Sequence, residues 1–216
     1  MSAKLDPEDM RHVIRAYQDA VAGVIGRYEG HVAKFMGDGV LAYFGWPRAH
    51  EDDAERAVRS GLAVVAAVAK QRTPGSEPLA VRVGIATGAV VVGDLVGVGS
   101  AQEAAVTGDT PNLAARLQAL AEPGSVVIAP ATMRLLGDTF AYDDLGAHAF
   151  KGFAEPVRAW RVSGEGRAAG RFAAMHGGEV APLVGRDREL ALLLDRWQLA
   201  KSGEGQMVLL SGEPGI

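Results

Sequence analysis

Two stretches in the first third of the chain repeat apolar residues at the spacing of one helix face. The first follows Asp6-Pro7, a capping carboxylate and a first-turn proline, and Gly30 closes it. Its apolar positions form one stripe: Met10, Val13, Ile14, Tyr17, Val21, Val24, Ile25 and Tyr28. The second, over 51–71, opens with three acidic residues and continues with the same spacing. We therefore expect two helices, each covering a sheet.

Between and after these helices the pattern changes to that of strands. Residues 31–36 and 40–44 are rich in β-branched and aromatic side chains, and Gly37-Asp38-Gly39 between them permits the positive-φ turn of a hairpin. Residues 81–88 and 89–93 are predicted to pair as two strands that turn at Gly88. Gly84, inside the first of these, would let another group, such as a ligand, approach the backbone closely.

Short strands and helices alternate through the rest of the first 162 residues. We expect a strand around Val106, a helix opening at Thr110, a strand over 126–129, a short helix over 132–136, and strands over 140–150 and 157–162. This order predicts an α+β or α/β sandwich, a mixed sheet with helices on one face or both.

Residues 163–176 lose both periods and consist mainly of Gly, Ala, Arg and Ser, which is typical of a linker. A second unit then begins with Pro182-Leu183-Val184-Gly185-Arg186. We expect a helix over 189–200 and a strand over 206–210, followed by Gly212-Glu213-Pro214-Gly215-Ile216.

Composition disfavours several classes of protein. The 216 residues are 48% hydrophobic, enough for the core of one soluble domain and part of another. A formal net charge of -4 provides no basic excess for nucleic acid or anionic lipid. No uncharged stretch approaches the roughly 20 residues that cross a bilayer, and the N-terminus has no apolar signal core. The absence of cysteine fits a reducing cytoplasm. We expect neither a nucleic-acid nor a membrane partner.

Lys34 and Asp38 are the first candidates for chemistry. Period-2 alternation places both on one side of the predicted hairpin, together with Met36, so an ammonium and a carboxylate can face one ligand. Such a pair could read a purine base and hold a metal ion. Taken alone, the same residues are more often an ordinary turn and a solvated edge lysine.

Asn112 and Arg116 are the second candidates. They are four positions apart just inside a helix start and project from the same face. Leu113, Leu117 and Leu120 form the adjacent stripe, so the core needs neither polar residue. Arginine suits a phosphate whose charge is redistributing, and asparagine can orient a sugar or a base. An isolated pair of this kind also matches an ordinary exposed helix face.

Four motifs, in this order, resemble the class III adenylate/guanylate cyclase catalytic domain. They are Lys34-Phe35-Met36-Gly37-Asp38, Val83-Gly84-Ile85-Ala86-Thr87-Gly88, Gly108-Asp109-Thr110-Pro111-Asn112-Leu113-Ala114-Ala115-Arg116-Leu117 and Phe150-Lys151-Gly152. The resemblance implies a ferredoxin-like βαββαβ core with added strands. It also implies a homodimer in which two domains pair head to tail and each site draws on both partners.

The resemblance implies a role for each candidate residue. Asp38 matches one of two aspartates that hold paired Mg²⁺ (or Mn²⁺) ions, and Lys34 matches the lysine that reads adenine. Asn112 and Arg116 match the ribose-orienting and transition-state residues. Lys151 looks like the lysine that holds the triphosphate. Cyclisation of this kind needs charge neutralisation by hard cations, arginine and lysine, with no covalent nucleophile.

Two departures from the family pattern bear on activity. Ala105 stands where the family commonly has Asp or Thr to complete the purine pocket, which leaves the choice between ATP and GTP open. The family's first strand carries the other metal aspartate and should precede the first helix, whereas here the helix begins almost at Met1. We therefore expect residues 1–162 to be a cyclase domain without its first strand, inactive by itself.

The C-terminal segment resembles a different family. After a linker over 163–181, residues 182–216 resemble the start of an AAA-type or signal-transduction P-loop ATPase domain. The P-loop pattern is Gly, four residues, then Gly-Lys-Ser/Thr, and its Gly-Lys is not present here. This segment is not expected to bind ATP.

The expected activity is conversion of ATP to 3′,5′-cyclic AMP and pyrophosphate by two-metal catalysis at a dimer interface, in signal transduction. The main alternative is a degenerate cyclase-like module that serves dimerisation or nucleotide sensing in a multidomain ATPase regulator. A diguanylate cyclase is a third alternative, although those enzymes use an acidic signature turn different from Gly37-Asp38-Gly39.

Overall fold

The computed structural model describes residues 6–72, 78–96, 103–166 and 185–211. The chain divides into two units, residues 1–178 and 179–216, and each is described by itself. No helix among the described residues is long and apolar enough to cross a membrane.

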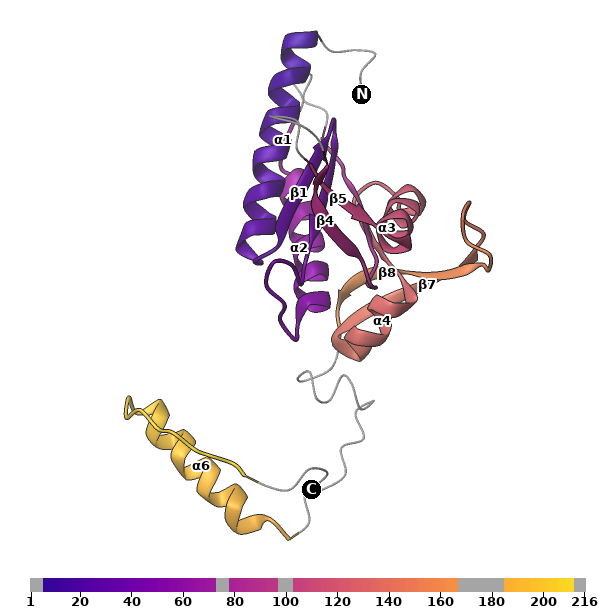
Figure 1. The fold of residues 1–216 in the computed structure, drawn as a ribbon. Coiled ribbons are helices and arrows are strands. Elements are labelled where there is room, and N and C mark those ends of the chain that lie inside the picture. The colour runs from indigo at the N-terminus through magenta and orange to yellow at the C-terminus, as the bar shows by residue number, and fades with distance from the viewer. Residues whose placement is uncertain (1–5, 73–77, 97–102, 167–184, 212–216) are drawn as a thin grey trace. The chain divides into compact units, whose positions relative to one another are not determined.

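The first unit begins with a helix that covers a hairpin (Figure 1). Helix α1 (Pro7–Arg27) is followed by β1 (His31–Met36) and β2 (Gly39–Tyr43), an antiparallel pair, and then by α2 (Asp53–Val68). The side chain of Asp6 caps α1 by accepting from the Glu8 amide at 3.0 Å, as the sequence predicts. The apolar stripe of α1 packs on α2 and on the hairpin, with a buried centre made of Val21, Val24, Ile25, Val64, Val68 and Leu79. Both predicted helices are confirmed.

The end of α1 differs from the prediction in one detail. Glu29, not Gly30, takes the left-handed conformation after the helix, with φ +55°. Gly30 is needed for space, because a Cβ there would lie 2.5 Å from the Phe44 ring and 2.8 Å from Ile25.

A four-stranded mixed sheet, in the order β3-β6-β8-β7, forms the rest of the core. Its strands are β3 (Arg82–Ile85), β6 (Ser125–Ile128), β7 (Phe140–His148) and β8 (Val157–Glu165). β3 runs parallel to β6, whereas β8 is antiparallel to both β6 and β7. This confirms the predicted α+β class.

Both faces of this sheet are covered, which explains the nearly continuous apolar sequence of β6. Val126 and Ile128 belong to the core on the side of α2 and α4 (Pro130–Leu136), which is followed by a short 3₁₀ turn, η2 (Gly137–Thr139). Val127 faces the opposite side, in the cluster that contains Leu117 of α3 (Asp109–Leu120). Alternate residues of one strand thus support helices on opposite faces.

The predicted pairing of 81–88 with 89–93 is wrong. β3 pairs with β6, and β4 (Val91–Val96) pairs instead with β5 (Glu103–Thr107) in a separate antiparallel hairpin. The close approach expected at Gly84 is confirmed, but the approaching group is a helix rather than a ligand. A Cβ at Gly84 would lie 2.2 Å from the Ala114 carbonyl oxygen and 2.3 Å from the Gln118 amide nitrogen, both in the backbone of α3.

The described strands form three separate sheets, β1-β2, β4-β5 and β3-β6-β8-β7. In this part of the chain β2 pairs only with β1, and β3 only with β6. The continuous ferredoxin-like sheet that the family resemblance implies is therefore not seen among the described residues. Helix α2 joins the β1–β2 hairpin to the four-stranded sheet, because Val64 packs with the hairpin cluster and Val58 with the sheet cluster.

The second unit contains α6 (Asp187–Lys201), which confirms the helix expected over 189–200. The strand expected over 206–210 is not observed, although Met207 and Leu209 are as apolar as a strand requires. A strand needs a neighbour for its backbone hydrogen bonds, and the described residues supply none here, so these side chains are 96% and 90% exposed. Most of the predicted linker and the Gly212–Ile216 turn lie outside the described residues, while β8 continues through the first residues of that linker to Glu165.

Candidate functional site

The tip of the β1–β2 hairpin presents Asp38. Met36 is opposite Gly39 in the register, so Gly37 and Asp38 form the turn, and Gly37 supplies the positive φ of +64°. The side chain of Gln18 in α1 donates a hydrogen bond to the Gly37 carbonyl at 2.9 Å. Asp38 is exposed beside this contact. Its carboxylate is thus held on a short turn that is attached to α1.

The pKa of Tyr17 in α1 depends on the negative charge of Asp38. Burial is the larger cause that raises the pKa of Tyr17 above its ordinary value, and the charge of Asp38 raises it further. The tip therefore combines an exposed carboxylate with a neighbouring phenol that stays protonated at neutral pH.

Lys34 lies on the same hairpin as Asp38. It is opposite Leu41, and a register shift between Val32 and Lys34 marks a bulge in β1. Lys34 and Met36 are both exposed and are two positions apart on one strand, so they share one side of the ribbon. The structure thus brings the two candidate residues of the hairpin onto one element.

Asn112 and Arg116 are exposed and lie one turn apart on α3. The Asn112 amide donates to the Gly108 carbonyl at 3.3 Å, within the first turn of the helix. Thr110 donates to the Ala89 carbonyl at 3.2 Å, which ties the start of α3 to the segment that follows β3. Leu117, the neighbour of Arg116, is fully buried against the sheet. Packing of Leu117 therefore fixes the helix that presents the two polar residues.

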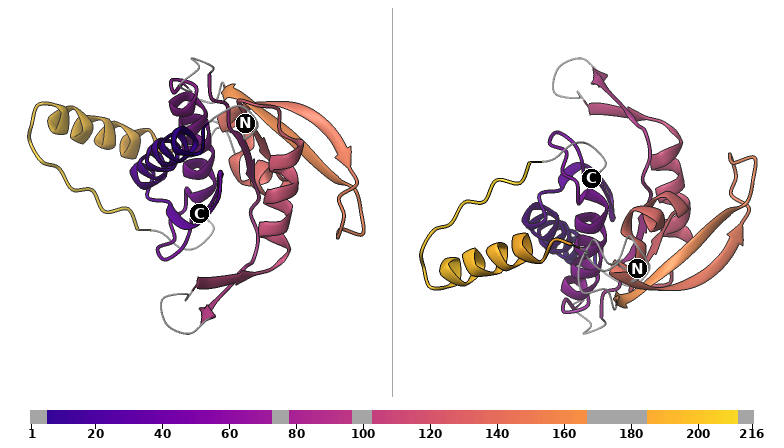
Figure 2. Two further views of the ribbon diagram at one scale, coloured as in Figure 1. Left: turned by 90° about the horizontal axis from the view of Figure 1, so that it is seen from above. Right: turned by 90° about the horizontal axis from the view of Figure 1, so that it is seen from below.

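Ala105 and Lys151 belong to two further elements. Ala105 lies in β5, and Lys151 lies in the turn between β7 and β8, where Gly152 has φ +98°. Figure 2 shows the β4–β5 and β7–β8 hairpins extending outward from the helices of the first unit. Lys151 is exposed.

The six candidate residues come from four separate elements and do not line a common pocket in the described part of the chain. Two hollows, of about 440 and 210 Å³, are lined by other residues: the first by α1 and the segment that follows α2, the second by residues of α3, β6, β7 and β8. A site built from all six residues needs something that joins these elements.

Asp38 has the right chemistry for a hard cation, since Mg²⁺ prefers carboxylate oxygens and substrate phosphates. Among the described residues, however, no three His, Cys, Asp or Glu side chains gather in a group that could hold a metal. Asp38 therefore does not belong to a preformed cluster of this kind in the described part of the chain.

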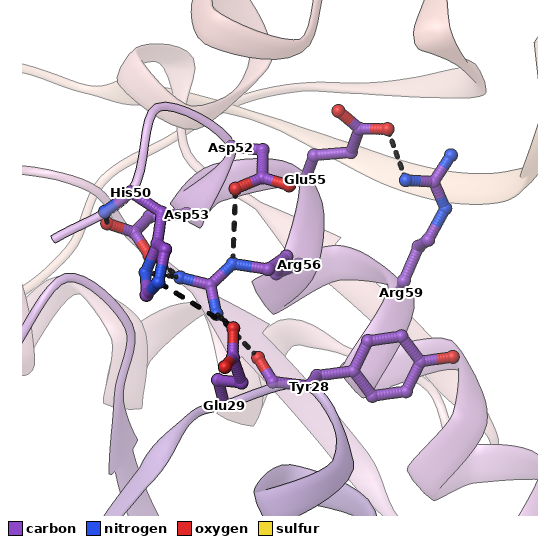
Figure 3. Close-up of polar contacts among 8 residues, drawn as sticks. All are labelled: Tyr28, Glu29, His50, Asp52, Asp53, Glu55, Arg56 and Arg59. Carbon is purple, nitrogen blue, oxygen red and sulfur yellow. Dashed lines mark hydrogen bonds and ion pairs between the residues drawn. The ribbon is translucent and has the colours of Figure 1, made fainter. Parts of the chain in front are cut away.

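Sequence reasoning missed a polar cluster at the base of the hairpin, centred on Arg56 of α2 (Figure 3). We call it the Arg56 clamp. It consists of Arg56 with Tyr28, Glu29, His50, Asp52 and Asp53. The acids at 51–53 suit the N-terminal end of a helix dipole, but Asp52 and Asp53 also stand four and three positions before Arg56. That spacing was the signal that could have revealed the pairing.

Comparison with known proteins gives a family for the first unit. A model of the family described as "Adenylate and Guanylate cyclase catalytic domain" matches residues 1–164. Adenylate cyclase 1 of Rhizobium meliloti (strain 1021) is 31% identical over 168 residues, which cover 75% of this chain and 25% of that protein. The chain spans 20% to 39% of the length of the curated relatives that it matches.

Solved structures of cyclase proteins share the fold of this chain. The guanylyl cyclase Cya2 is 33% identical with a TM-score of 0.72, over 78% of this chain and 87% of that one. The adenylyl cyclase CyaB from P. aeruginosa is 30% identical with a TM-score of 0.70, over 78% of this chain and 89% of that one. From the family match, the relatives and the shared fold together, we conclude that this chain belongs to the adenylate and guanylate cyclase catalytic domain family.

Proposed function

We propose that the first unit is a nucleotide cyclase domain that converts ATP to 3′,5′-cyclic AMP and pyrophosphate at the interface of a homodimer, in cytoplasmic signal transduction. The observation that carries this proposal is the hairpin tip. It presents an exposed carboxylate, Asp38, on a two-residue turn that Gln18 holds at 2.9 Å. A rigid, exposed carboxylate is what a metal-bound triphosphate requires of a protein ligand.

The proposed roles follow from side-chain chemistry. In the reaction the ribose 3′ oxygen attacks the α-phosphorus, releases its proton to solvent water, and displaces pyrophosphate as the bond from the α-phosphorus to the bridging oxygen breaks. Arg116 offers a permanently charged fork to the phosphate oxygens as their charge redistributes, and Asn112 can hold the ribose by hydrogen bonds. Lys34 would read the base and Lys151 would hold the triphosphate. The metal, bound in part by Asp38, supplies charge neutralisation at the phosphates.

A second copy of the chain would explain why the candidate residues lie on separate elements. Met36, which shares one side of the ribbon with Lys34, is 53% exposed, and Phe35 on the other side is 43% exposed, so a partner would have apolar surface of the hairpin to cover. A head-to-tail pair would bring the hairpin of one protomer to α3 of the other.

The base preference rests on few residues. Ala105 offers no hydrogen bond to a purine edge, so Lys34 is the main candidate for selecting adenine. Relatives named adenylyl and guanylyl cyclase are similarly distant from this chain, at 30% and 33% identity. GTP is therefore the second substrate to test.

The described residues hold no cluster of metal ligands around Asp38, which supports a further part of the proposal, that these residues are inactive alone. β2 and β3 each have one strand partner among the described residues. A strand contributed by another part of the protein could pair there and bring the second aspartate. The segment over 182–216 is proposed to begin a P-loop ATPase domain.

The alternative is a degenerate cyclase-like module for dimerisation or nucleotide sensing. Ala105 favours it, as does the lack of a three-ligand metal cluster among the described residues. It predicts nucleotide binding or dimer formation without turnover.

The test is production of cyclic nucleotide by the full-length protein with ATP or GTP and Mg²⁺ or Mn²⁺. Asp38→Asn should lower the rate by about 100-fold or more, because a neutral amide cannot replace a carboxylate at a hard cation. Asp144→Asn is the matched control, since Asp144 is an exposed carboxylate engaged by Arg158 on the β7–β8 ribbon. Absence of metal-dependent product from the unsubstituted protein would overturn the enzyme proposal in favour of the binding module.

A further inference from the structure

The Arg56 clamp joins the two ends of the β1–β2 hairpin to α2 (Figure 3). On the side that leads into β1, Arg56 Nη1 donates to the Tyr28 carbonyl at 2.9 Å and to Glu29 Oε2 at 3.3 Å. On the side that follows β2, Arg56 Nη2 contacts His50 Nδ1 and donates to Asp53. One guanidinium therefore touches the chain just before the hairpin and just after it.

The surroundings of Arg56 make this attachment specific. Its side chain is 11% exposed, and Nε lies 3.3 Å from Asp52 Oδ1. The His50 amide donates to Asp53 Oδ2 at 2.8 Å, and His50 Nε2 lies 3.6 Å from Glu29 Oε2, so the partners of Arg56 also bind each other. A planar, forked cation can satisfy several acceptors in different directions at once, which a single ammonium cannot.

The orientation of the hairpin at its base determines where its tip, and therefore Asp38, lies. Seven residues separate His31 at the base from Asp38, a distance of roughly 23 Å at about 3.3 Å per residue. A tilt of about 5° at the base would then move the tip by roughly 2 Å, and about 1 Å of misplacement can cost a hundredfold in rate. A two-stranded hairpin is only marginally stable by itself, and here its support comes from apolar packing on the cluster of α1 and α2 and from the Arg56 clamp at its base.

We propose that Arg56 is a positioning residue for Asp38, acting through the orientation of the β1–β2 hairpin. Gln18 fixes the tip locally, by its bond to Gly37, and Arg56 fixes the base. The link to catalysis rests on the proposed function, whereas the link between Arg56 and the hairpin tip does not.

The first experiment follows the backbone amide signals of Gly37, Asp38 and Gly39 by ¹H–¹⁵N NMR in the whole chain. Arg56→Met should move these signals although the substitution lies at the other end of the ribbon, and Arg56→Lys should move them less. Arg59→Met is the matched control. Arg59 lies one turn further along α2, pairs with Glu55 and stacks over Phe140, and it should leave the tip signals in place.

The second experiment titrates the same samples with Mn²⁺, whose paramagnetism broadens signals of amides near a bound ion. The Mn²⁺ concentration that gives half-broadening at the tip should rise about tenfold in Arg56→Met and remain unchanged in Arg59→Met. In the cyclase assay of the full-length protein, Arg56→Met should lower kcat by roughly 10- to 100-fold, with partial recovery in Arg56→Lys. A fall in kcat without a matching rise in nucleotide KM separates misplacement from loss of nucleotide binding.

Two results would overturn the proposal: tip signals unmoved in folded Arg56→Met, or moved equally by Arg59→Met. If Arg56→Met does not fold, His50→Gln, which removes one partner at the partly exposed side of the clamp, decides the question by the same signals. A wild-type protein that makes no cyclic nucleotide would refute the proposed function while the NMR result still decides the role of Arg56.

Discussion

The two elements that carry the polar candidates differ in whether a charged contact adds to their apolar packing. The β1–β2 hairpin, with Lys34 and Asp38, packs on α1 and is also attached at its base through the charged Arg56 clamp. Helix α3, with Asn112 and Arg116, is attached by close packing, since Leu117 is fully buried and the backbone of α3 lies directly on Gly84.

The difference follows from what each element can bury. α3 lies on a sheet face that presents Val127 and Ala159, so apolar contact alone can hold it. The base of the hairpin is formed by turns and loops whose polar backbone groups need partners, and Arg56 supplies one for the Tyr28 carbonyl. The part of the hairpin's support that comes from the Arg56 clamp should therefore respond to salt, whereas the apolar packing of α3 should not.

Leu117→Ala should give the largest effect on stability. Leu117 is fully buried, and its truncation should lower the free energy of unfolding by about 3–4 kcal/mol, independent of salt, as the cavity leaves its neighbours without contacts. Urea unfolding measures this. Leu135→Ala, at a side chain that is 55% exposed, is the control and should change the free energy by less than about 1 kcal/mol. Equal losses would show that α3 is not held by packing.

Gly84→Ala should have the next largest effect. The new Cβ would meet the backbone of α3 at 2.2 Å, so the helix must shift, at a cost of about 2–3 kcal/mol. Gly23→Ala in α1 is the matched substitution, because a Cβ at Gly23 would meet nothing within 4 Å beyond the neighbouring residues and backbone of its own helix. It should be neutral or stabilise by up to about 1 kcal/mol. A Gly84 variant as stable as the wild type would refute the close contact.

Glu29→Gln tests the charged support and should have a smaller effect. Glu29 is 66% exposed and lies 3.3 Å from Arg56, so its loss should lower the free energy of unfolding by less than about 1 kcal/mol. The deficit should shrink between low salt and about 1 M NaCl, where the Debye length is about 3 Å. A deficit that does not change with salt would contradict an electrostatic origin.

Tyr142→Phe should have the smallest effect at neutral pH. The Tyr142 hydroxyl is buried without a hydrogen bond of standard geometry, so its removal should be neutral or stabilise by up to about 1 kcal/mol.

The same substitution has a signature at alkaline pH. Burial raises the pKa of Tyr142 from 10.0 to about 12. The folded state thus favours the neutral phenol, and this contribution to stability is fully present below pH 10 and is lost as the pH rises through about 12. Unfolding curves across this range should fall less steeply for Tyr142→Phe than for the wild type, and parallel curves would contradict burial of the phenol.

The elements that carry the candidate residues could be predicted from the sequence, whereas the Arg56 clamp that supports the hairpin could not. The hairpin, the two covering helices and the polar face of α3 follow from local periodicity and turn chemistry, which are properties of neighbouring residues. The Arg56 clamp joins residues 28 and 56, and no local pattern shows that they meet. Only the spacing of Asp52 and Asp53 before Arg56 hinted at it.

The errors have the same physical origin. Residues 81–88 and 89–93 have strand composition, but the partner of each strand lies elsewhere, at β6 and β5. Residues 206–210 have strand composition as well and have no partner among the described residues. A strand's composition does not specify its neighbour, because backbone hydrogen bonds are nearly the same for every sequence.

The sequence by itself determined the class of fold, the turn that presents Asp38 and the helix face that presents Asn112 and Arg116, because each depends on side chains within a few positions of one another. Tertiary structure alone decided which strands pair, that Gly84 accommodates a helix, and that Arg56 ties the hairpin to α2. These features depend on packing and charge between residues that are far apart in the sequence but close together in space.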